Sequence, residues 1–271
     1  MKLLNGSELA GYIKERHAHE VRALRQAHHI LPKLAIVQCK DDPIINTYVR
    51  LKQRYGSEIL IDVDVHQVSQ DDARETIQQL NADDGIQGII VQLPLPDTSQ
   101  TDEIVNLVAP EKDVDALGKY SNFDPATPMA ILWLLAGYNI DLAGKRILLI
   151  GRGKLVGAPL EKMLQASGLD VSVADRTTKD LNALTLDADI IITATGSPAI
   201  IYPDMVKQGA VVVDAGVASE DGKTVGDVSV EMYEREDLTI TPKKGGVGPL
   251  TVCALFENVI RAARNTVSLQ A

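Results

Sequence analysis

The sequence has few of the residues that mark secreted or metal-binding proteins. Only two cysteines, Cys39 and Cys253, occur among 271 residues, and neither has a second cysteine or a histidine cluster nearby. This spacing predicts neither a disulfide framework nor a zinc site, so no metal is expected. Reduced thiols fit a cytoplasmic protein best.

Long hydrophobic runs are also missing. The chain reaches Glu8 after only a few apolar residues, so no stretch at its start has the length of a signal peptide. No other run approaches the roughly 20 apolar residues that a membrane-spanning helix needs. We therefore expect a cytoplasmic protein with no membrane partner.

Positive charge is in deficit. The chain has 27 Lys and Arg against 37 Asp and Glu, which gives a formal net charge of -10. Nucleic-acid binding depends on clustered Lys and Arg, so a nucleic-acid partner is not expected. Local sites for small anions are compatible with this balance.

What is present is the composition of a folded globular protein. Hydrophobic residues make up 45% of the chain and charged residues 24%, which leaves no large disordered fraction. The length favours two domains of modest size over a single core.

Predicted strands and helices alternate along the first half of the chain. Apolar runs predict strands at residues 33–38, 59–66 and 88–92, and helical patterns occupy residues 7–26, 44–58 and 70–83. Alternation of this kind is typical of a parallel sheet built from βαβ units, which binds ligands at the carboxyl ends of its strands.

A second alternating series predicts a Rossmann-like domain. Its strands are expected at residues 146–150, 170–174, 190–194 and 210–214, with a linking helix at 125–137 and a final helix at 250–264. The predicted fold class is α/β: an amino-terminal αβα substrate domain (residues 1–124 and 250–271), a Rossmann-like dinucleotide-binding domain (residues 125–249), and a cleft between them.

A glycine-rich loop follows the first strand of that second series. Gly151, Gly153 and Gly157 lie between a predicted strand and a predicted helix, where glycines let the backbone approach a pyrophosphate. Their spacing, G-x-G-x-x-x-G, departs from the common G-x-G-x-x-G. The context predicts a dinucleotide site, and an ordinary strand-to-helix turn is the alternative.

Nucleotide preference depends on three side chains near this loop. Asp175 lies at the end of the next predicted strand, where an acidic residue usually accepts the ribose hydroxyl of NAD. Arg152 and Arg176 could instead bind the 2'-phosphate of NADP through charge-assisted hydrogen bonds. The two arginines favour NADP over NAD, and solvated surface charge is the alternative for both.

Five segments, in order, resemble the bifunctional methylenetetrahydrofolate dehydrogenase/methenyltetrahydrofolate cyclohydrolase family over essentially the full length. They are Asp-Asp-Pro at 41–43 with Tyr-Val-Arg-Leu-Lys at 48–52; Val-Gln-Leu-Pro-Leu-Pro at 91–96; Pro-Glu-Lys-Asp-Val-Asp at 110–115; Gly-Arg at 151–152 with Val-Gly-Ala-Pro at 156–159; and Gly-Gly-Val-Gly-Pro-Leu-Thr at 245–251. Any one segment could occur by chance, but the ordered set is specific.

The resemblance implies an oxidoreductase and hydrolase of one-carbon metabolism. Such an enzyme oxidises 5,10-methylenetetrahydrofolate with NADP and hydrolyses the methenyl product to 10-formyltetrahydrofolate. It also implies tetrahydrofolate one-carbon substrates as partners, a homodimer and a cytoplasmic location.

The candidate catalytic residues are Tyr48, Lys52, Gln92 and Asp115. Tyr48 and Lys52 are four residues apart on a predicted helix, so they share one face, and a partly desolvated lysine has a lowered pKa suited to proton transfer. A surface lysine on an amphipathic helix is the alternative. Gln92 ends a predicted strand, where an α/β site is expected.

The resemblance assigns roles to these and to further residues. Lys52 becomes the catalytic group, Gln92 its orienting partner, Tyr48 a contact of the pterin ring and Asp115 the carboxylate that binds the pterin, whereas Asp113 is expected to be structural. Further substrate-binding candidates are Val91, Leu93, Gly245, Gly246 and Pro249. The cofactor-binding candidates are Thr127, Gly151, Arg152, Gly153, Val156, Gly157, Arg176, Val217 and Thr251.

Several positions depart from the family pattern. The chain has Ile45 where the family usually has Ser, Ala116 where it has Gly, Gly153 where it has a loop Ser, and Lys243 and Lys244 before the last glycine loop. Three alternatives therefore stay open: a dehydrogenase with weak or no cyclohydrolase activity, a different two-domain dehydrogenase such as one acting on shikimate or an amino acid, and a homologue that binds without turnover.

Overall fold

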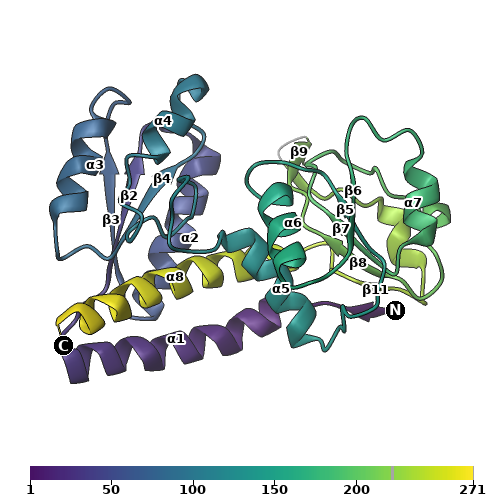
Figure 1. Cartoon of the computed structure of the whole chain (residues 1–271), viewed down its shortest axis with the longest axis horizontal. Helices are drawn as coiled ribbons and strands as arrows, with labels where there is room; N and C mark the ends of the chain where they lie inside the picture. Colours follow the sequence, from purple (N-terminus) through teal and green to yellow (C-terminus); the bar gives the residue numbers. More distant parts are fainter. Residues whose placement is uncertain (221–222, 271) are drawn as a thin grey trace. The chain divides into compact units, whose positions relative to one another are not determined.

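The computed structural model describes residues 1–220 and 223–270, which form two compact units (Figure 1). The first, called the six-stranded unit after its main sheet, comprises Met1–Ala10 and Thr127–Thr251. The second, the three-stranded unit, comprises Gly11–Ala126 and Val252–Ala271. Within the described residues, no helix is both long enough and apolar enough to cross a bilayer.

The three-stranded unit alternates strands and helices. Its elements are α1 (Gly6–His28, from Gly11 onward), β2 (Lys33–Gln38), α2 (Pro43–Glu58), β3 (Asp62–Gln67), α3 (Ala73–Ala82), β4 (Gly88–Gln92), the short 3-10 helix η1 (Thr98–Gln100), α4 (Thr101–Val105) and the part of α8 (Val247–Gln270) that follows Thr251.

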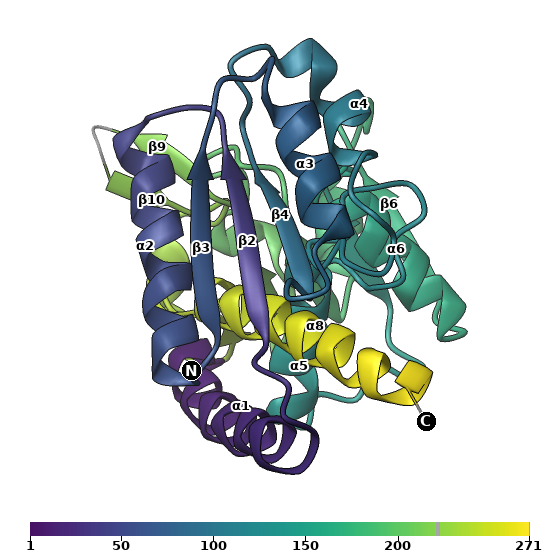
Figure 2. The same cartoon turned by 90° about the vertical axis from the view of Figure 1, so that its left-hand side faces the viewer.

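All strands of this sheet are parallel and run in the order β3-β2-β4 (Figure 2). Both faces are buried: Ala35 and Val37 pack with Ile77 and other apolar side chains, including those of α3, and the alternate residue Ile36 is equally buried. Because β2 continues to β3 on one side and the chain returns to β4 on the other, the carboxyl ends of β2 and β4 form a topological switch point, where α/β proteins bind ligands.

The six-stranded unit has the order β1-β11-β8-β7-β5-β6, and all its paired strands are parallel. Its strands and helices are β1 (Lys2–Leu3), α5 (Ala126–Gly137, from Thr127 onward), β5 (Ile147–Ile150), α6 (Gly157–Ala166), β6 (Val171–Ala174), α7 (Leu181–Asp187), β7 (Ile190–Thr193), β8 (Val211–Asp214) and β11 (Thr239–Ile240). A separate hairpin pairs β9 (Ala218–Glu220) with β10 (Lys223–Val225), and two 3-10 helices, η2 (Pro203–Met205) and η3 (Val230–Glu234), complete the unit.

The α/β fold class is confirmed, and two features differ from the sequence-based expectation. The strand expected at 59–66 begins only at Asp62, because Ile59 caps α2 and Leu60 turns the chain with a φ of 66°. Residues Met1–Ala10 belong to the six-stranded unit, since β1 pairs with β11.

Candidate active site

Helix α2 begins next to the carboxyl end of β2. The side chain of Asp42 caps it by accepting hydrogen bonds from the backbone N–H groups of Ile44 (2.9 Å) and Ile45 (3.3 Å), and Pro43 occupies the first turn, where no N–H is needed. The helix start is therefore fixed by local sequence.

Two polar side chains lie beside the buried face of α2. Val49 is buried, while Tyr48 is 45% exposed and Lys52 is half-buried. The ammonium of Lys52 donates a 2.7 Å hydrogen bond to Oε1 of Gln92. Desolvation lowers the pKa of Lys52, which makes its neutral form easier to reach.

Gln92 is the last residue of β4 and lies opposite Gln38 of β2 in the sheet register. Its side-chain amide donates to the backbone oxygen of Leu93 at 3.0 Å. This second bond turns Oε1 toward Lys52, so the glutamine holds the lysine in one orientation.

Asp115 lies near the carboxyl end of β4, because the segment before it pairs with that strand. Residue Asp113 forms a parallel bridge with Ile89 of β4, and two residues later the chain reaches Asp115. Burial raises the pKa of Asp115, and the nearby positive charge of Lys52 opposes that rise. The structure therefore brings Lys52, Gln92 and Asp115 together, with Tyr48 one turn before the lysine on α2.

The loop that carries Asp115 is held by its neighbours. The buried carboxylate of Asp113 accepts hydrogen bonds from the N–H groups of Gly118 (2.8 Å) and Leu117 (3.4 Å), so this aspartate is structural, as expected. Ala116 has a φ of 55°, a left-handed conformation that costs a non-glycine residue roughly 1–2 kcal/mol.

Two residues that the sequence did not single out also fix this loop. Lys112 donates to three backbone oxygens around the carboxyl end of α3, those of Leu80 (3.1 Å), Asn81 (2.9 Å) and Asp83 (2.7 Å). Asn258 of α8 donates to the backbone oxygen of Val114 at 2.9 Å. The segment match at residues 110–115 could have suggested Lys112, but no local signal indicates Asn258.

In the six-stranded unit, the glycine loop joins β5 to α6. Gly151 has a φ of 99°, and a Cβ on it would lie 2.6 Å from the oxygen of Ala194, which follows β7. A Cβ on Gly157 would lie 2.0 Å from the oxygen of Gly151, whereas Gly153 faces open space. At the start of α6 no side chain caps the helix, the N–H of Ala158 donates to the oxygen of Gly153 at 3.0 Å and Pro159 has no N–H, so the N–H of Gly157 is the one that can meet an anion.

The charged residues around this loop have partners of their own. Arg152 forms a two-pronged ion pair with Glu161 of α6, at 2.8 and 3.0 Å. Asp175 accepts from both the N–H and the hydroxyl of Thr177, which lowers its pKa. Arg176 is exposed and has no hydrogen bond or ion pair within the described part of the chain.

Of the remaining candidates, Val91 lies in β4 and Leu93 directly after it, and the others lie in the six-stranded unit. Thr127 and Thr251 come together, with their hydroxyl oxygens 3.4 Å apart, and Val217 is 61% exposed. Gly245 has a φ of 80° and its backbone oxygen accepts from the N–H of Ser7 at 2.9 Å. Gly246 and Pro249 are half-buried, and Val156 precedes the first residue of α6.

The two units thus offer two kinds of chemistry. A lysine beside an amide and a carboxylate can transfer protons, and a strand-loop-helix with obligatory glycines can hold a dinucleotide. In the described residues, no group of three or more His, Cys, Asp or Glu side chains is arranged to hold a metal ion.

Comparison with known proteins decides the family. The model for the catalytic domain of tetrahydrofolate dehydrogenase/cyclohydrolase matches residues 4–115, and the model for the NAD(P)-binding domain of the same family matches residues 125–267. The chain belongs to the tetrahydrofolate dehydrogenase/cyclohydrolase family. Because both halves match it, a shikimate or amino-acid dehydrogenase is excluded.

Relatives in this family align along the whole chain. The bifunctional protein FolD of Campylobacter jejuni (strain RM1221) is 39% identical, with 99% of this chain and 100% of the relative covered. A crystal structure of the Campylobacter jejuni bifunctional FolD superposes with a TM-score of 0.92 at 38% identity and covers 98% of this chain and 99% of that one. The Trypanosoma brucei family member, solved with NADP and an inhibitor, has a TM-score of 0.90 at 27% identity, with 98% of each chain covered.

Proposed function

We propose that this protein oxidises 5,10-methylenetetrahydrofolate with NADP and hydrolyses the resulting 5,10-methenyltetrahydrofolate to 10-formyltetrahydrofolate. The observation that carries the proposal is the grouping of Lys52, Gln92 and Asp115 at the switch point of the three-stranded sheet. The name of the solved Campylobacter jejuni enzyme, which gives both a methylenetetrahydrofolate dehydrogenase and a cyclohydrolase, supports it.

Lys52 serves the hydrolytic step. As water attacks the methenyl carbon and forms the new C–O bond, the neutral amine accepts a proton from that water. The proton then passes to the ring nitrogen as its bond to the same carbon breaks, and the remaining hydroxyl proton is released to the amine as the C=O of the formyl group forms. Desolvation of Lys52 favours the neutral amine, and the bond to Gln92 fixes its direction.

Asp115 and Tyr48 hold the substrate. The two oxygens of a carboxylate can accept hydrogen bonds from the pterin's amino group and its adjacent ring N–H, which sets the orientation of the ring. Tyr48 is exposed one turn before Lys52 on α2, where an aromatic ring can stack on the pterin.

The nucleotide-binding residues fit NADP. Gly151 and Gly157 allow the loop backbone to pack closely, Gly153 faces open space where a pyrophosphate can approach, and the N–H of Gly157 at the uncapped start of α6 is a donor for it. Arg176 is free to meet a 2'-phosphate, whereas the carboxylate of Asp175 is engaged by Thr177. NADP held by these residues would supply a nicotinamide ring as the hydride acceptor for the methylene carbon.

A steady-state assay with purified protein tests the proposal. Methylenetetrahydrofolate with either NADP or NAD, and methenyltetrahydrofolate alone, are followed by absorbance. We expect both reactions, with the lower KM for NADP. Oxidation without hydrolysis would identify a dehydrogenase with weak or no cyclohydrolase activity, and absence of both reactions would indicate a homologue that binds without turnover.

Assembly and location also belong to the proposal. The family resemblance leads us to propose a homodimer in the cytoplasm. Light scattering on the peak that elutes from a size-exclusion column measures the oligomeric state. A fluorescent fusion expressed in cells shows the location of the protein.

A further inference from the structure

The helix that carries Lys52 is anchored by a buried tyrosine one turn further along. Tyr55 is 9% exposed, and its ring lies 4.9 Å from that of Phe256 on α8, at an interplanar angle of 33°. Its hydroxyl lies 3.0 Å from Nδ1 of His17 on α1. Any shift of this tyrosine would move Lys52 with it, because both belong to the same stretch of α2.

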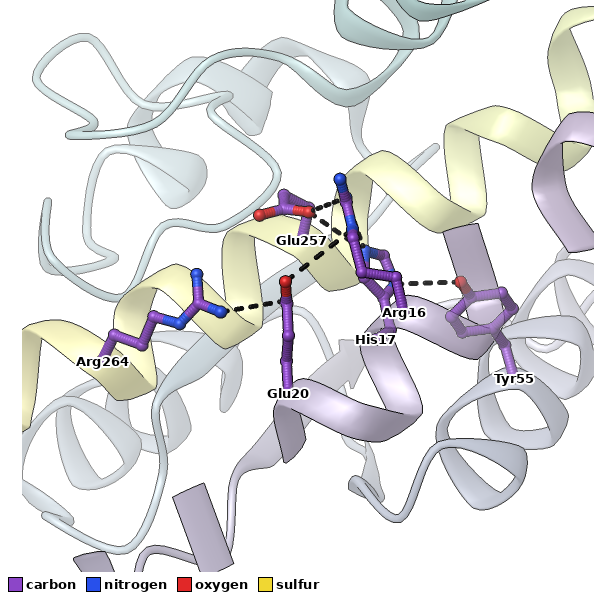
Figure 3. A network of polar contacts seen from close by, with 6 residues as sticks. All are labelled: Arg16, His17, Glu20, Tyr55, Glu257 and Arg264. Carbon is purple, nitrogen blue, oxygen red and sulfur yellow. Dashed lines mark hydrogen bonds and ion pairs between the residues drawn. The ribbon is translucent and has the colours of Figure 1, made fainter. Parts of the chain in front are cut away.

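His17 links that tyrosine to the carboxyl-terminal helix. The imidazole is fully buried, and its Nε2 lies 3.0 Å from Oε2 of Glu257 on α8. The same carboxylate oxygen accepts a 2.5 Å bond from Arg16 (Figure 3). Three helices, α1, α2 and α8, thus meet in one chain of polar contacts.

With a neutral imidazole, each hydrogen bond of His17 has a defined donor and acceptor. The hydrogen bond from His17 lowers the pKa of Glu257, so the carboxylate is ionised and accepts from Nε2. Nδ1 then accepts from the hydroxyl of Tyr55. Burial raises the pKa of Tyr55, which keeps that hydroxyl protonated.

The next residue of α8 holds the other side of the site. Asn258 is fully buried, and its amide donates to the backbone oxygens of Val114 and Asp124, both at 2.9 Å. Val114 directly precedes Asp115. One amide therefore fixes the two ends of the segment that carries the carboxylate.

We infer that two neighbouring residues of α8, Glu257 and Asn258, position the reacting groups against each other. The first acts through His17 and Tyr55 on the helix of the lysine, and the second acts through the backbone on the loop of the carboxylate. This inference rests on the proposed function, because it assigns hydrolysis to the lysine and substrate orientation to the carboxylate.

Tyr55→Phe tests the first arm, because it keeps the ring against Phe256 and removes only the hydroxyl. We expect the kcat of methenyl hydrolysis to fall about tenfold, since small misplacements of a reacting group are costly, while its KM and the dehydrogenase kcat stay within about twofold. The matched control is Tyr138→Phe, which removes a hydroxyl bonded to the N–H and oxygen of Asn5 at 2.9 and 3.2 Å. An unchanged hydrolytic kcat in Tyr55→Phe, or an equal fall of both activities, would overturn the inference.

Rescue by a conservative variant separates positioning from mere stability. Glu257→Gln keeps an oxygen that accepts from His17, so it should hydrolyse at close to the wild-type rate, whereas Glu257→Ala should match Tyr55→Phe. Equal hydrolytic rates in the two Glu257 variants would contradict the role assigned here.

Asn258→Ser tests the contact between α8 and the loop of Asp115. Here we expect the effect on KM and not mainly on kcat. The smaller side chain cannot reach both backbone oxygens, so the KM for folate should rise about tenfold with a smaller change in kcat. A fall in kcat alone would overturn this arm. If Asn258→Ser does not fold, the Tyr55 and Glu257 comparisons decide the inference. A wild-type protein that hydrolyses no methenyl substrate would instead refute the proposed function.

Discussion

Replacing Asp115 by alanine should weaken folate binding while leaving the nucleotide site unchanged. The carboxylate lies beside Lys52 in a desolvated place, where burial raises its pKa and the lysine charge opposes the rise. A hydrogen bond to a charged group contributes about 1.5–3 kcal/mol. A loss of about 2 kcal/mol corresponds to a folate Kd about 30-fold higher, since every 1.4 kcal/mol is tenfold.

Isothermal titration with tetrahydrofolate and, separately, with NADP measures the effect. Asp71→Ala is the control, because Asp71 is an exposed aspartate of the same unit, in the turn two residues before α3. We expect NADP to bind both variants like wild type. Equal folate affinity in Asp115→Ala and wild type would refute the role of the carboxylate and the reasoning from its desolvation.

Three further predictions concern pH, backbone strain and nucleotide choice. Only the neutral amine of Lys52 accepts a proton, so the rate of hydrolysis should rise with pH. Because burial lowers the pKa of Lys52, the midpoint of that rise should lie below lysine's usual pKa of about 10.4. In a rate-pH profile of Lys52→Arg this midpoint should be absent. Ala116→Gly should raise the free energy of unfolding by about 1 kcal/mol at most. Glycine removes the strain of an alanine in the left-handed conformation, and this gain exceeds the cost of the greater freedom of the unfolded chain. A urea titration that shows a lower free energy of unfolding would contradict this prediction. Arg176→Ala should raise the KM for NADP and leave that for NAD unchanged; equal changes with both nucleotides would exclude a contact with the 2'-phosphate.

Buried parallel strands were the part of the fold most readable from sequence. β2 and β4 match the predicted residues because each is a continuous apolar run, and β3 was wrong at its start because alternation in the sequence continues through the turn at Leu60. The two-residue strands β1 and β11 were missed, since two residues are too few to show a pattern and the partner of β1 lies more than 230 residues away.

The candidate residues were found by local pattern and resemblance, but their supports were not. Lys52 and Gln92 each lie in a recognisable segment, and the structure joins them at 2.7 Å. Asn258 lies in an ordinary helical pattern and acts on a loop more than 130 residues earlier in the chain, so nothing near it in sequence reveals the contact. The pairing of Arg152 with Glu161 was likewise hidden, because both read as surface charge.

The role of Lys52 is tested most directly by the rate of methenyltetrahydrofolate hydrolysis in Lys52→Met, measured beside Arg54→Met, which removes an exposed cation from the same helix. Lys52→Met should lose hydrolysis and still bind NADP nearly as well as wild type, while Arg54→Met should retain both. Formation of 10-formyltetrahydrofolate by Lys52→Met at the wild-type rate would contradict the catalytic role of Lys52.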